Sequence, residues 1–183
     1  MGMNNKVLGL IFASINDTNV IDLTKLRTMG SIPFGGRYRL IDFPLSNMVN
    51  SGISEVGVIT KSNYGSLLDH LGSGREWDLT GKTGGLHLLP PFSHVEALNN
   101  VREFVEHSKS EYVVLSNCDV VTNIDFNAAL QQHIDTEADI TIIYSKGFYS
   151  KEKNPSTNVI SVDENHTVKE VLITPAITGE CNV

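Results

Sequence analysis

Short apolar runs separated by helical patterns constrain the fold of this chain more than any other feature of its sequence. Four such runs are bounded by turn residues: Val7 to Ala13, Val56 to Thr60, Tyr112 to Ser116 and Ile140 to Ser145. Apolar strands that alternate with helices are typical of βαβ units, in which helices cover both faces of a mostly parallel sheet. The alternation therefore predicts an α/β fold of the Rossmann-like class.

Helical periodicity between the runs places the connecting helices. Leu45, Met48 and Val49 recur at helical spacing. Pro44 suits the first helical position, and Gly52 can end this helix by taking a positive φ. Further helices are predicted over Tyr64 to Leu71, over Val95 to Val105, and from the N-cap Asp125 to about Thr136. The remaining pattern predicts a loop over Trp77 to Gly85 and a hairpin made of Val159 to Val162 and Val168 to Ile173.

No repeat or long linker interrupts this pattern, so we expect one domain over residues 1–183. The segment after Ile173 reads TPAITGECNV, which neither caps a domain nor begins a recognisable element. We expect it to be either a frayed terminus or the point at which a longer protein continues.

An acidic charge balance excludes some classes of function. The chain has 14 basic and 21 acidic residues and a net charge of −7, whereas nucleic acid is held by clustered lysines and arginines. No apolar run reaches the roughly 20 residues that span a bilayer. Cys118 and Cys181 lack the spacing of a disulfide framework or a zinc site, and the six histidines lack metal spacing and are assigned no role. We therefore expect a cytoplasmic protein that binds neither nucleic acid nor membrane.

The block PFGGRYRLIDFPLSN combines several residues that suit anion binding. The pair Gly35 and Gly36 permits a tight turn, and the guanidinium groups of Arg37 and Arg39 can contact anions in a bidentate way. Asp42 can orient one of the two arginines. From the residues alone, this block is either a phosphate-lined site or a structural turn with solvated arginines.

At this point the chain resembles a known family, bacterial ADP-glucose pyrophosphorylase, also called glucose-1-phosphate adenylyltransferase. The resemblance covers most of residues 6–145 and rests on motifs in the family's order: PFGGRYRLIDFPLSN, then NSGI from Asn50, VGVIT from Val56, WDL from Trp77, the pair Gly84-Gly85, and LLPPF from Leu88. It implies a Rossmann-like nucleotidyltransferase domain. It also implies a reaction in which glucose 1-phosphate attacks the α-phosphorus of ATP, with Mg²⁺ neutralising the leaving pyrophosphate.

The chain departs from that family where active members bind triphosphate. Those members carry a LAGGxGxRL loop after the first strand and an AKPAV lysine just before the PFGG turn. Counting back from PFGG, these positions fall on Ser14, Ile15, Asp17, Asn19 and Met29. No catalytic position is therefore intact, because the loop glycines, the arginine and the lysine are all replaced. Loss of one preorganised donor to developing charge typically costs about 2.7–4 kcal/mol of transition-state stabilisation.

Two further departures bear on the same site. A GTADAV segment of the sugar-nucleotide cleft is absent after LLPPF, and the family's metal-binding run after the third strand reads LSNCDVVTNID here, one residue longer. Counting forward, the acid's place falls on Cys118, whereas counting back it falls on Asp119. Asp119 is either a ligand of Mg²⁺ or an ordinary loop aspartate.

The resemblance is strongest to the regulatory-type, GlgD-like subunit, which pairs with a homologous catalytic subunit in a hetero-oligomer, expected to be a tetramer. A left-handed β-helix is implied after this domain. The sequence leaves two alternatives open: a catalytically active, divergent adenylyltransferase, or a non-catalytic module that binds nucleotide sugars. No cofactor is assigned to this chain itself.

A basic cluster falls in the region where that family senses phosphorylated effectors. Its members are Lys25, Arg27, Arg37 and Arg39. They either bind ATP or a sugar phosphate as an effector, or serve as exposed solubilising charge.

Overall fold

The computed structural model describes residues 7–14, 20–60, 63–81, 84–89, 94–150, 158–173, 175 and 178–183, with the side chains of 94–100 left out. The chain divides into two compact units, Met1–Gln131 and Gln132–Val183, each described by itself below. The single domain expected over residues 1–183 stays a prediction. Among the described residues, no helix has both the length and the apolar character that crossing a membrane requires.

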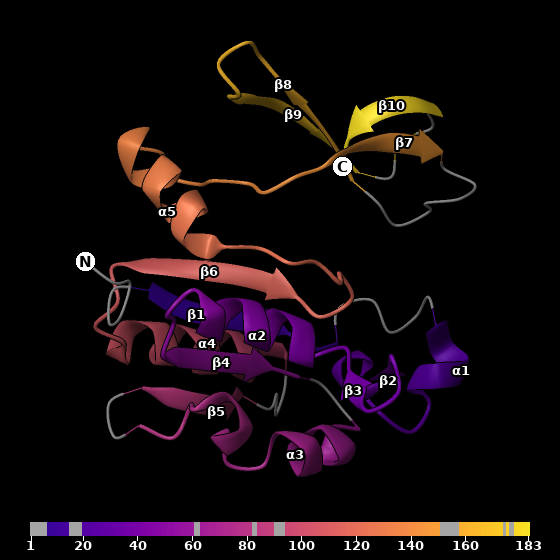
Figure 1. Cartoon of the computed structure of the whole chain (residues 1–183), viewed down its shortest axis with the longest axis vertical. Helices are drawn as coiled ribbons and strands as arrows, with labels where there is room; N and C mark the ends of the chain where they lie inside the picture. The colour runs from indigo at the N-terminus through magenta and orange to yellow at the C-terminus, as the bar shows by residue number, and fades with distance from the viewer. Residues whose placement is uncertain are drawn as a thin grey trace. The chain divides into compact units, whose positions relative to one another are not determined.

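A four-stranded parallel sheet organises the first unit (Figure 1). Its spatial order is β5-β4-β1-β6, and every neighbouring pair runs parallel. The strands are β1 (Val7–Phe12), β4 (Glu55–Ile59), β5 (Gly85–Leu89) and β6 (Tyr112–Asn117). The sheet confirms the predicted α/β class and the first three predicted strands. β5 was not predicted, although its LHLL run follows a glycine pair.

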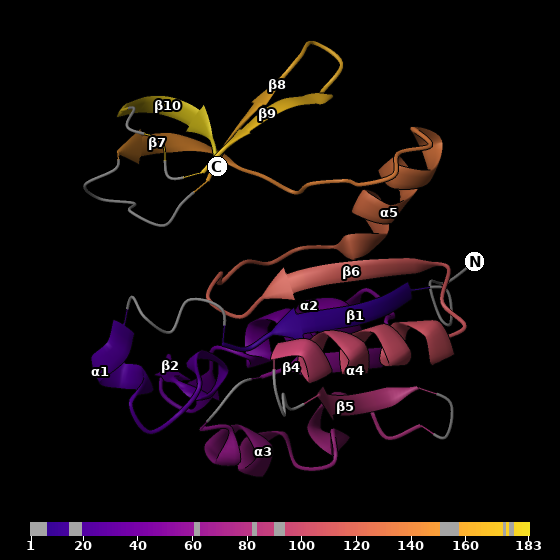
Figure 2. The same ribbon diagram turned by 180° about the vertical axis from the view of Figure 1, so that it is seen from behind.

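Helices cover both faces of this sheet, as the alternation predicted. α2 (Asp42–Asn50) lies on one face and α4 (His94–His107) on the other, as the two opposite views show (Figures 1 and 2). α4 packs on β5, where the ring centroids of Phe104 and His87 lie 5.0 Å apart. The core between the layers is apolar and includes Val7, Ile11, Ile41, Leu45, Met48, Ile53, Val56, Val58 and Leu67.

The helices mostly begin and end where the sequence predicted. α2 starts two residues before the predicted Pro44, which instead occupies the third helical position, where its missing N–H still has no intrahelical acceptor. Gly52 ends this helix at a φ of +82°, as predicted. α3 (Gly65–Leu71) matches its prediction and is followed by the short helix η3 (Arg75–Trp77).

Four small elements lie together at one end of this unit (Figures 1 and 2). They are α1 (Ile21–Thr24), η2 (Met29–Ser31) and the two-stranded hairpin of β2 (Pro33–Phe34) and β3 (Tyr38–Arg39). The hairpin pairs Pro33 with Arg39 and Phe34 with Tyr38. It leads directly into α2, so the motif block of the sequence spans a turn and a helix.

Asp125 caps the next helix, α5 (Phe126–Asp135), as predicted. Its Oδ1 accepts the backbone N–H of Asn127 at 2.9 Å. This hydrogen bond is the main cause of the lowered pKa of Asp125, because it favours the charged carboxylate. The helix ends one residue before the predicted Thr136.

The predicted strand Ile140 to Ser145 is wrong: this segment has no strand pairing except at its last residue. Ser145 exchanges two backbone hydrogen bonds of 2.7 Å with Val183. Ile140 is 80% exposed, so the apolar run lacks the neighbouring strand that would bury it. An apolar run forms a strand only when a neighbouring strand provides hydrogen-bond partners for its backbone groups.

A four-stranded antiparallel sheet forms the second unit, with the order β7-β10-β8-β9. Its strands are β7 (Lys146–Ser150), β8 (Val159–Val162), β9 (Val168–Leu172) and β10 (Thr178–Asn182). β8 and β9 confirm the predicted hairpin. β10 pairs with both β7 and β8, so the segment after Ile173 supplies a central strand. The expectation of a frayed terminus is therefore wrong.

The turn of this hairpin is organised by one carboxylate. Asp163 Oδ1 accepts the backbone N–H groups of Asn165 and Thr167, each at 2.9 Å. Asp163 Oδ2 lies 2.9 Å from Lys169 Nζ. The hydrogen bond from Lys169 is the largest cause of the lowered pKa of Asp163, followed by the N–H of Thr167.

Replacing this carboxylate should weaken the fold in a pH-dependent way. The unfolded chain holds the Asp163 proton more tightly than the folded chain, so the stabilisation is complete above about pH 4 and vanishes as the pH falls through the folded pKa. We expect Asp163→Asn to melt at a lower temperature than the wild type at neutral pH, with a gap that closes in acid. Thermal melts over a pH series check this. The control Glu164→Gln removes a charge of the same sign from the same turn and should leave Tm nearly unchanged. If the difference in Tm between the wild type and Asp163→Asn persisted in acid, the stabilisation would not come from the charged carboxylate of Asp163.

Candidate functional site

The carboxyl edge of the parallel sheet is where open α/β folds bind ligands. Three strands end there in register, because Phe12 of β1 lies opposite Ile59 of β4 and Asn117 of β6. The segments that follow these ends carry three residues singled out in the sequence, Ser14, Cys118 and Asp119, and also Thr60. The site is built upward from this edge.

Ser14 is the first of the two positions that the resemblance assigns to the loop glycines. It is only 3% exposed, and its hydroxyl shares a hydrogen bond of 3.3 Å with the hydroxyl of Thr60. The side chain is thus fixed inward, between the ends of β1 and β4. The other replaced loop positions, Ile15, Asp17 and Asn19, lie outside the described residues.

Met29, at the position that the resemblance assigns to the AKPAV lysine, belongs to the hydrophobic core with 6% exposure. The η2 turn that carries it is tied to two elements. Gly30 N–H donates to the carbonyl of Ala13 at 3.0 Å, and Ile41 N–H donates to the carbonyl of Gly30 at 3.0 Å. Position 29 therefore supplies packing beneath the end of β1 rather than a cation beside it.

Thr28, immediately before this turn, has a buried hydroxyl without a partner. The residue is fully buried, and its Oγ1 has no hydrogen-bond partner in the described structure, although its carbonyl accepts the Ser31 hydroxyl at 2.9 Å. An unsatisfied buried hydroxyl is unfavourable by about 1–3 kcal/mol. No sequence pattern indicated this feature.

The glycine pair makes the tight turn that was predicted. Gly35 and Gly36 have φ values of +60° and +94°, which residues with a Cβ rarely adopt. Arg37, which completes the turn, is exposed, and its Cζ lies 5.3 Å from the centre of the Tyr38 ring. This cation–π contact leaves the guanidinium N–H groups on the surface of the hairpin.

Arg39 has a structural contact instead of an exposed guanidinium. Its Nη1 donates to the carbonyl and, at 2.8 Å, to the hydroxyl of Ser66 on α3. Among the described residues no ion pair links Asp42 to an arginine, so the expectation that Asp42 orients a guanidinium is wrong. Asp42 Oδ2 instead accepts the backbone N–H of Arg39 at 2.9 Å.

His70, which was assigned no role, completes this contact between the motif block and α3. Its Nε2 lies 2.6 Å from Asp42 Oδ1, with both side chains largely buried, so the imidazole N–H donates to the carboxylate. The His70 ring also packs edge-on against Trp77, with centroids 5.8 Å apart. The block is thus bound to α3 by polar groups, and the His70 ring extends this contact to Trp77 of η3.

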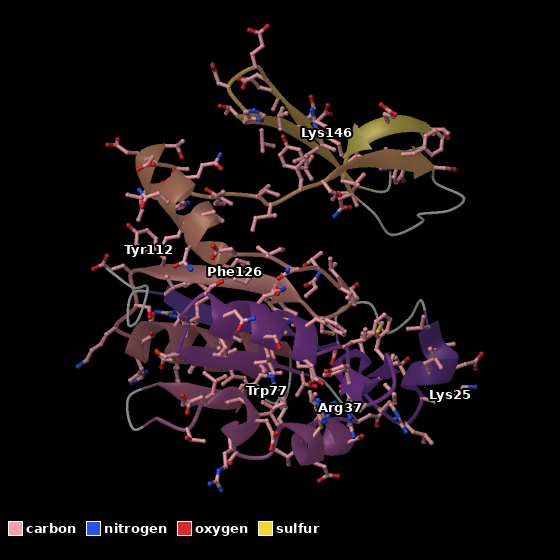
Figure 3. All side chains as sticks on the ribbon, in the orientation of Figure 1. Lys25, Arg37, Trp77, Tyr112, Phe126 and Lys146 are labelled. Atoms are coloured by element: carbon pink, nitrogen blue, oxygen red, sulfur yellow. The ribbon has the colours of Figure 1, made fainter. Side chains whose placement is uncertain are left out.

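The remaining cations of the predicted cluster are partly engaged. Lys25 Nζ pairs with Asp22 Oδ1 at 2.7 Å in an exposed ion pair, and Arg27 is half-buried. Lys25 and Arg37 lie at the same end of the unit, near α1 and the hairpin (Figure 3). Arg37 is thus exposed at this end, Lys25 is exposed but paired with Asp22, and Arg39 is withdrawn toward α3.

The structure separates the two candidates for the acid after β6. Cys118 is 1% exposed and its N–H donates to the carbonyl of Phe12 at 3.3 Å, so its side chain is part of the core. Asp119 is exposed at the carboxyl edge. Within the described ranges, no three His, Cys, Asp or Glu side chains gather as a metal site. A Mg²⁺ ion at Asp119 would need substrate phosphate and water to complete its shell.

Sequence reasoning also missed Asn47, at the end of the motif block, and Ser51, which follows α2; the side chains of both are buried. Asn47 binds the backbone of the segment between β6 and α5, and Ser51 accepts the N–H of Phe126 at the start of α5, each about 75 residues further along the chain. No local pattern could indicate contacts of this separation.

Comparison with known proteins gives consistent matches. A family model described as nucleotidyl transferase matches residues 8–174. The glycogen biosynthesis protein GlgD of Geobacillus stearothermophilus is 40% identical over 178 residues, covering 90% of this chain and 52% of the relative. The GlgD protein of Bacillus subtilis is 43% identical over 153 residues, covering 79% and 45%. A glucose-1-phosphate adenylyltransferase of Clostridium perfringens is 37% identical over 147 residues, covering 75% and 38%.

The chain spans about half the length of the two GlgD relatives and less of the adenylyltransferase. Among solved structures, a Bacillus anthracis protein described as a candidate glucose-1-phosphate thymidylyltransferase, in complex with sucrose, superposes with a TM-score of 0.67. It is 17% identical, and the match covers 96% of this chain and 70% of that one. This likeness shows that the two proteins share a fold.

Removing the unpaired hydroxyl should stabilise the chain. Thr28→Val keeps the shape and the β-branch and deletes the buried Oγ1, so we expect the free energy of unfolding to rise by about 1 kcal/mol or more. Urea denaturation measures this change. Thr60→Val is the matched control, because it deletes a hydroxyl that bonds to Ser14 and should lower stability by about 1 kcal/mol. A loss of stability in Thr28→Val would mean that the hydroxyl does have a partner.

Proposed function

This chain belongs to the nucleotidyl transferase family, and we propose that it is a regulatory, catalytically weak subunit of glucose-1-phosphate adenylyltransferase that acts in glycogen biosynthesis. The reaction of the whole enzyme joins ATP and glucose 1-phosphate into ADP-glucose and pyrophosphate. In this proposal, a homologous subunit carries out the chemistry, and this chain changes the activity of that subunit.

One observation carries the proposal: two positions that would bind phosphate serve as packing in this chain. Met29 lies in the hydrophobic core, and the buried Ser14 hydroxyl bonds to Thr60. Phosphoryl-type transfer depends chiefly on preorganised cations and amides. A site that lacks the lysine and has its first glycine position filled by an inward side chain can supply neither at those points.

The names of the relatives support the pathway and the subunit type. Two of them, at 40% and 43% identity, are glycogen biosynthesis proteins named GlgD, and a third, at 37%, is a glucose-1-phosphate adenylyltransferase. A chain that resembles both groups yet lacks cations at the triphosphate site suits a modulating role. We further propose a cytoplasmic hetero-oligomer, a tetramer with the catalytic subunit as partner.

Asp119 favours the alternative of a divergent active enzyme. It is an exposed carboxylate at the carboxyl edge of the sheet, at one of the two positions onto which the metal-binding acid of the resembled family falls. When bound there, Mg²⁺ would neutralise charge on the phosphates. Asp119 alone would hold a metal and a nucleotide weakly, because the other cationic contacts are replaced.

An activity assay tests the proposal directly. The purified protein, given MgATP and glucose 1-phosphate, should form no sustained ADP-glucose on its own. Mixed with the homologous catalytic subunit, it should change that subunit's kcat or KM. The catalytic subunit alone is the control, and it separates a modulating partner from an inert one. Sustained turnover by the isolated chain would establish the divergent enzyme instead.

Arg37 should contribute to sensing of a phosphorylated effector by the hetero-oligomer. Its guanidinium is exposed on the hairpin, and a lost charged contact to phosphate corresponds to about a tenfold change in affinity. We expect Arg37→Ala to raise the sugar-phosphate concentration for half-maximal response by about that factor. Titration of the hetero-oligomer's activity measures it. Arg75→Ala, an exposed arginine on η3, is the matched control. An equal response in both variants would assign Arg37 to solubility alone.

A further inference from the structure

The end of the first unit formed by α1 and the β2–β3 hairpin, which we call the basic end, carries five exposed apolar side chains. Leu26 is 87% exposed, and Ile21 and Leu23 are 61% and 58% exposed. Phe34 and Tyr38 of the hairpin are each 46% exposed. Single exposed apolar residues are normal, whereas several at one end of a protein mark an interaction surface.

Positive charge accompanies these apolar side chains. Residues 21–39 contain four basic residues and one acidic residue, Asp22, which pairs with Lys25. Arg37 is exposed and lies at the same end as Lys25 (Figure 3), and within the described ranges no carboxylate pairs with it. Aromatic residues and arginine are enriched in protein–protein interfaces. A partner of the basic end should therefore present apolar side chains together with carboxylates.

The carboxyl end of α5, residues 134–140, has the complementary character, and we call it the acidic turn. Residues 110–145 include six acidic residues and no lysine or arginine. Ile134 and Ile140, at the two ends of the turn, are 44% and 80% exposed. Three of the six acidic residues lie between them and are exposed: Asp135, Glu137 and Asp139.

The carboxylates of the acidic turn are unfavourably placed within their own chain. The carboxyl end of an α-helix carries a partial negative charge, so carboxylates there raise the free energy and a cation lowers it. The last turn of α5 contains His133 but no lysine or arginine. Among the described residues, no lysine or arginine pairs with Glu137 or Asp139. A cation supplied by another chain is therefore favoured at this turn.

We propose that the basic end of one copy of this chain binds the acidic turn of a second copy. Arg37 meets the carboxylates of Glu137 and Asp139, and the apolar side chains of α1 cover Ile134 and Ile140. The apolar contact supplies affinity, and the opposite charges set the orientation. Because each copy has both surfaces, two copies close into a dimer or further copies extend the chain. This association is independent of the proposed function, since it needs neither turnover nor a homologous subunit.

Sedimentation velocity of the purified chain over a concentration series tests the proposal, at about 150 mM salt to screen the net charge. We expect the average mass to rise with concentration. Arg37→Glu and Glu137→Lys should each raise the dissociation constant by more than about tenfold, because each replaces an attraction by a repulsion. The double variant restores the attraction with the signs exchanged, so it should associate nearly as the wild type does.

Matched controls separate a local contact from an effect of net charge. Arg75→Glu and Glu164→Lys make the same two changes of net charge at exposed positions outside the two surfaces, and they should associate as the wild type does. Leu26→Ser tests the apolar part and should also weaken association. All these positions are exposed, so the thermal melts of the variants should stay close to that of the wild type.

Weaker association in the single variants, with recovery in the double variant, supports the proposal. A monomer mass at every concentration up to about 1 mM overturns it, since weaker binding than that is no specific interface. Association that Arg37→Glu and Leu26→Ser leave unchanged also overturns it, because the contact then lies elsewhere. Weakening without recovery in the double variant has the same consequence, since residues 37 and 137 then do not face each other.

Discussion

The packing of α2 against β1 is the interaction on which the rest of the site depends. Gly9 makes it possible, because a Cβ added there would lie 2.5 Å from Met48 Sδ. With the helix seated this closely, its first turn binds the hairpin through Asp42 and Arg39 N–H. Its last turns bind the loop after β6 through Asn47. A nine-residue helix therefore connects the basic turn at one end with the exposed carboxylate at the other.

The sequence predicted elements well where their signal is local. The apolar runs of β1, β4 and β6, the Asp125 cap and the hairpin of β8 and β9 all follow from residues within one element. The errors concern pairing, which is non-local. Ile140 to Ser145 is as apolar as a strand but has no neighbour, whereas Thr178–Asn182 is polar and becomes a strand because β7 and β8 pair with it.

In the candidate site, too, local features were predictable and non-local contacts were not. The turn at Gly35 and Gly36 was predictable, since only its own backbone conformation is involved. The partners of the polar side chains were not. His70 reaches Asp42 from 28 residues away, and the bonds of Asn47 join residues 75 and 77 positions apart. Composition and spacing give the kind of residue available at a site, but only the fold decides which groups meet.

The positions that the resemblance assigns to phosphate binding take part in the packing of this chain. Met29 is now part of the core, and Ser14 closes the gap between two strand ends with a hydroxyl bond to Thr60. Returning a lysine to position 29 would place a charge where apolar neighbours cannot solvate it, and burial of an unpaired charge is strongly unfavourable. The packing that stabilises this edge of the sheet therefore also opposes a return of phosphate binding there. Asp119, held outside the core by its loop, is not subject to that constraint.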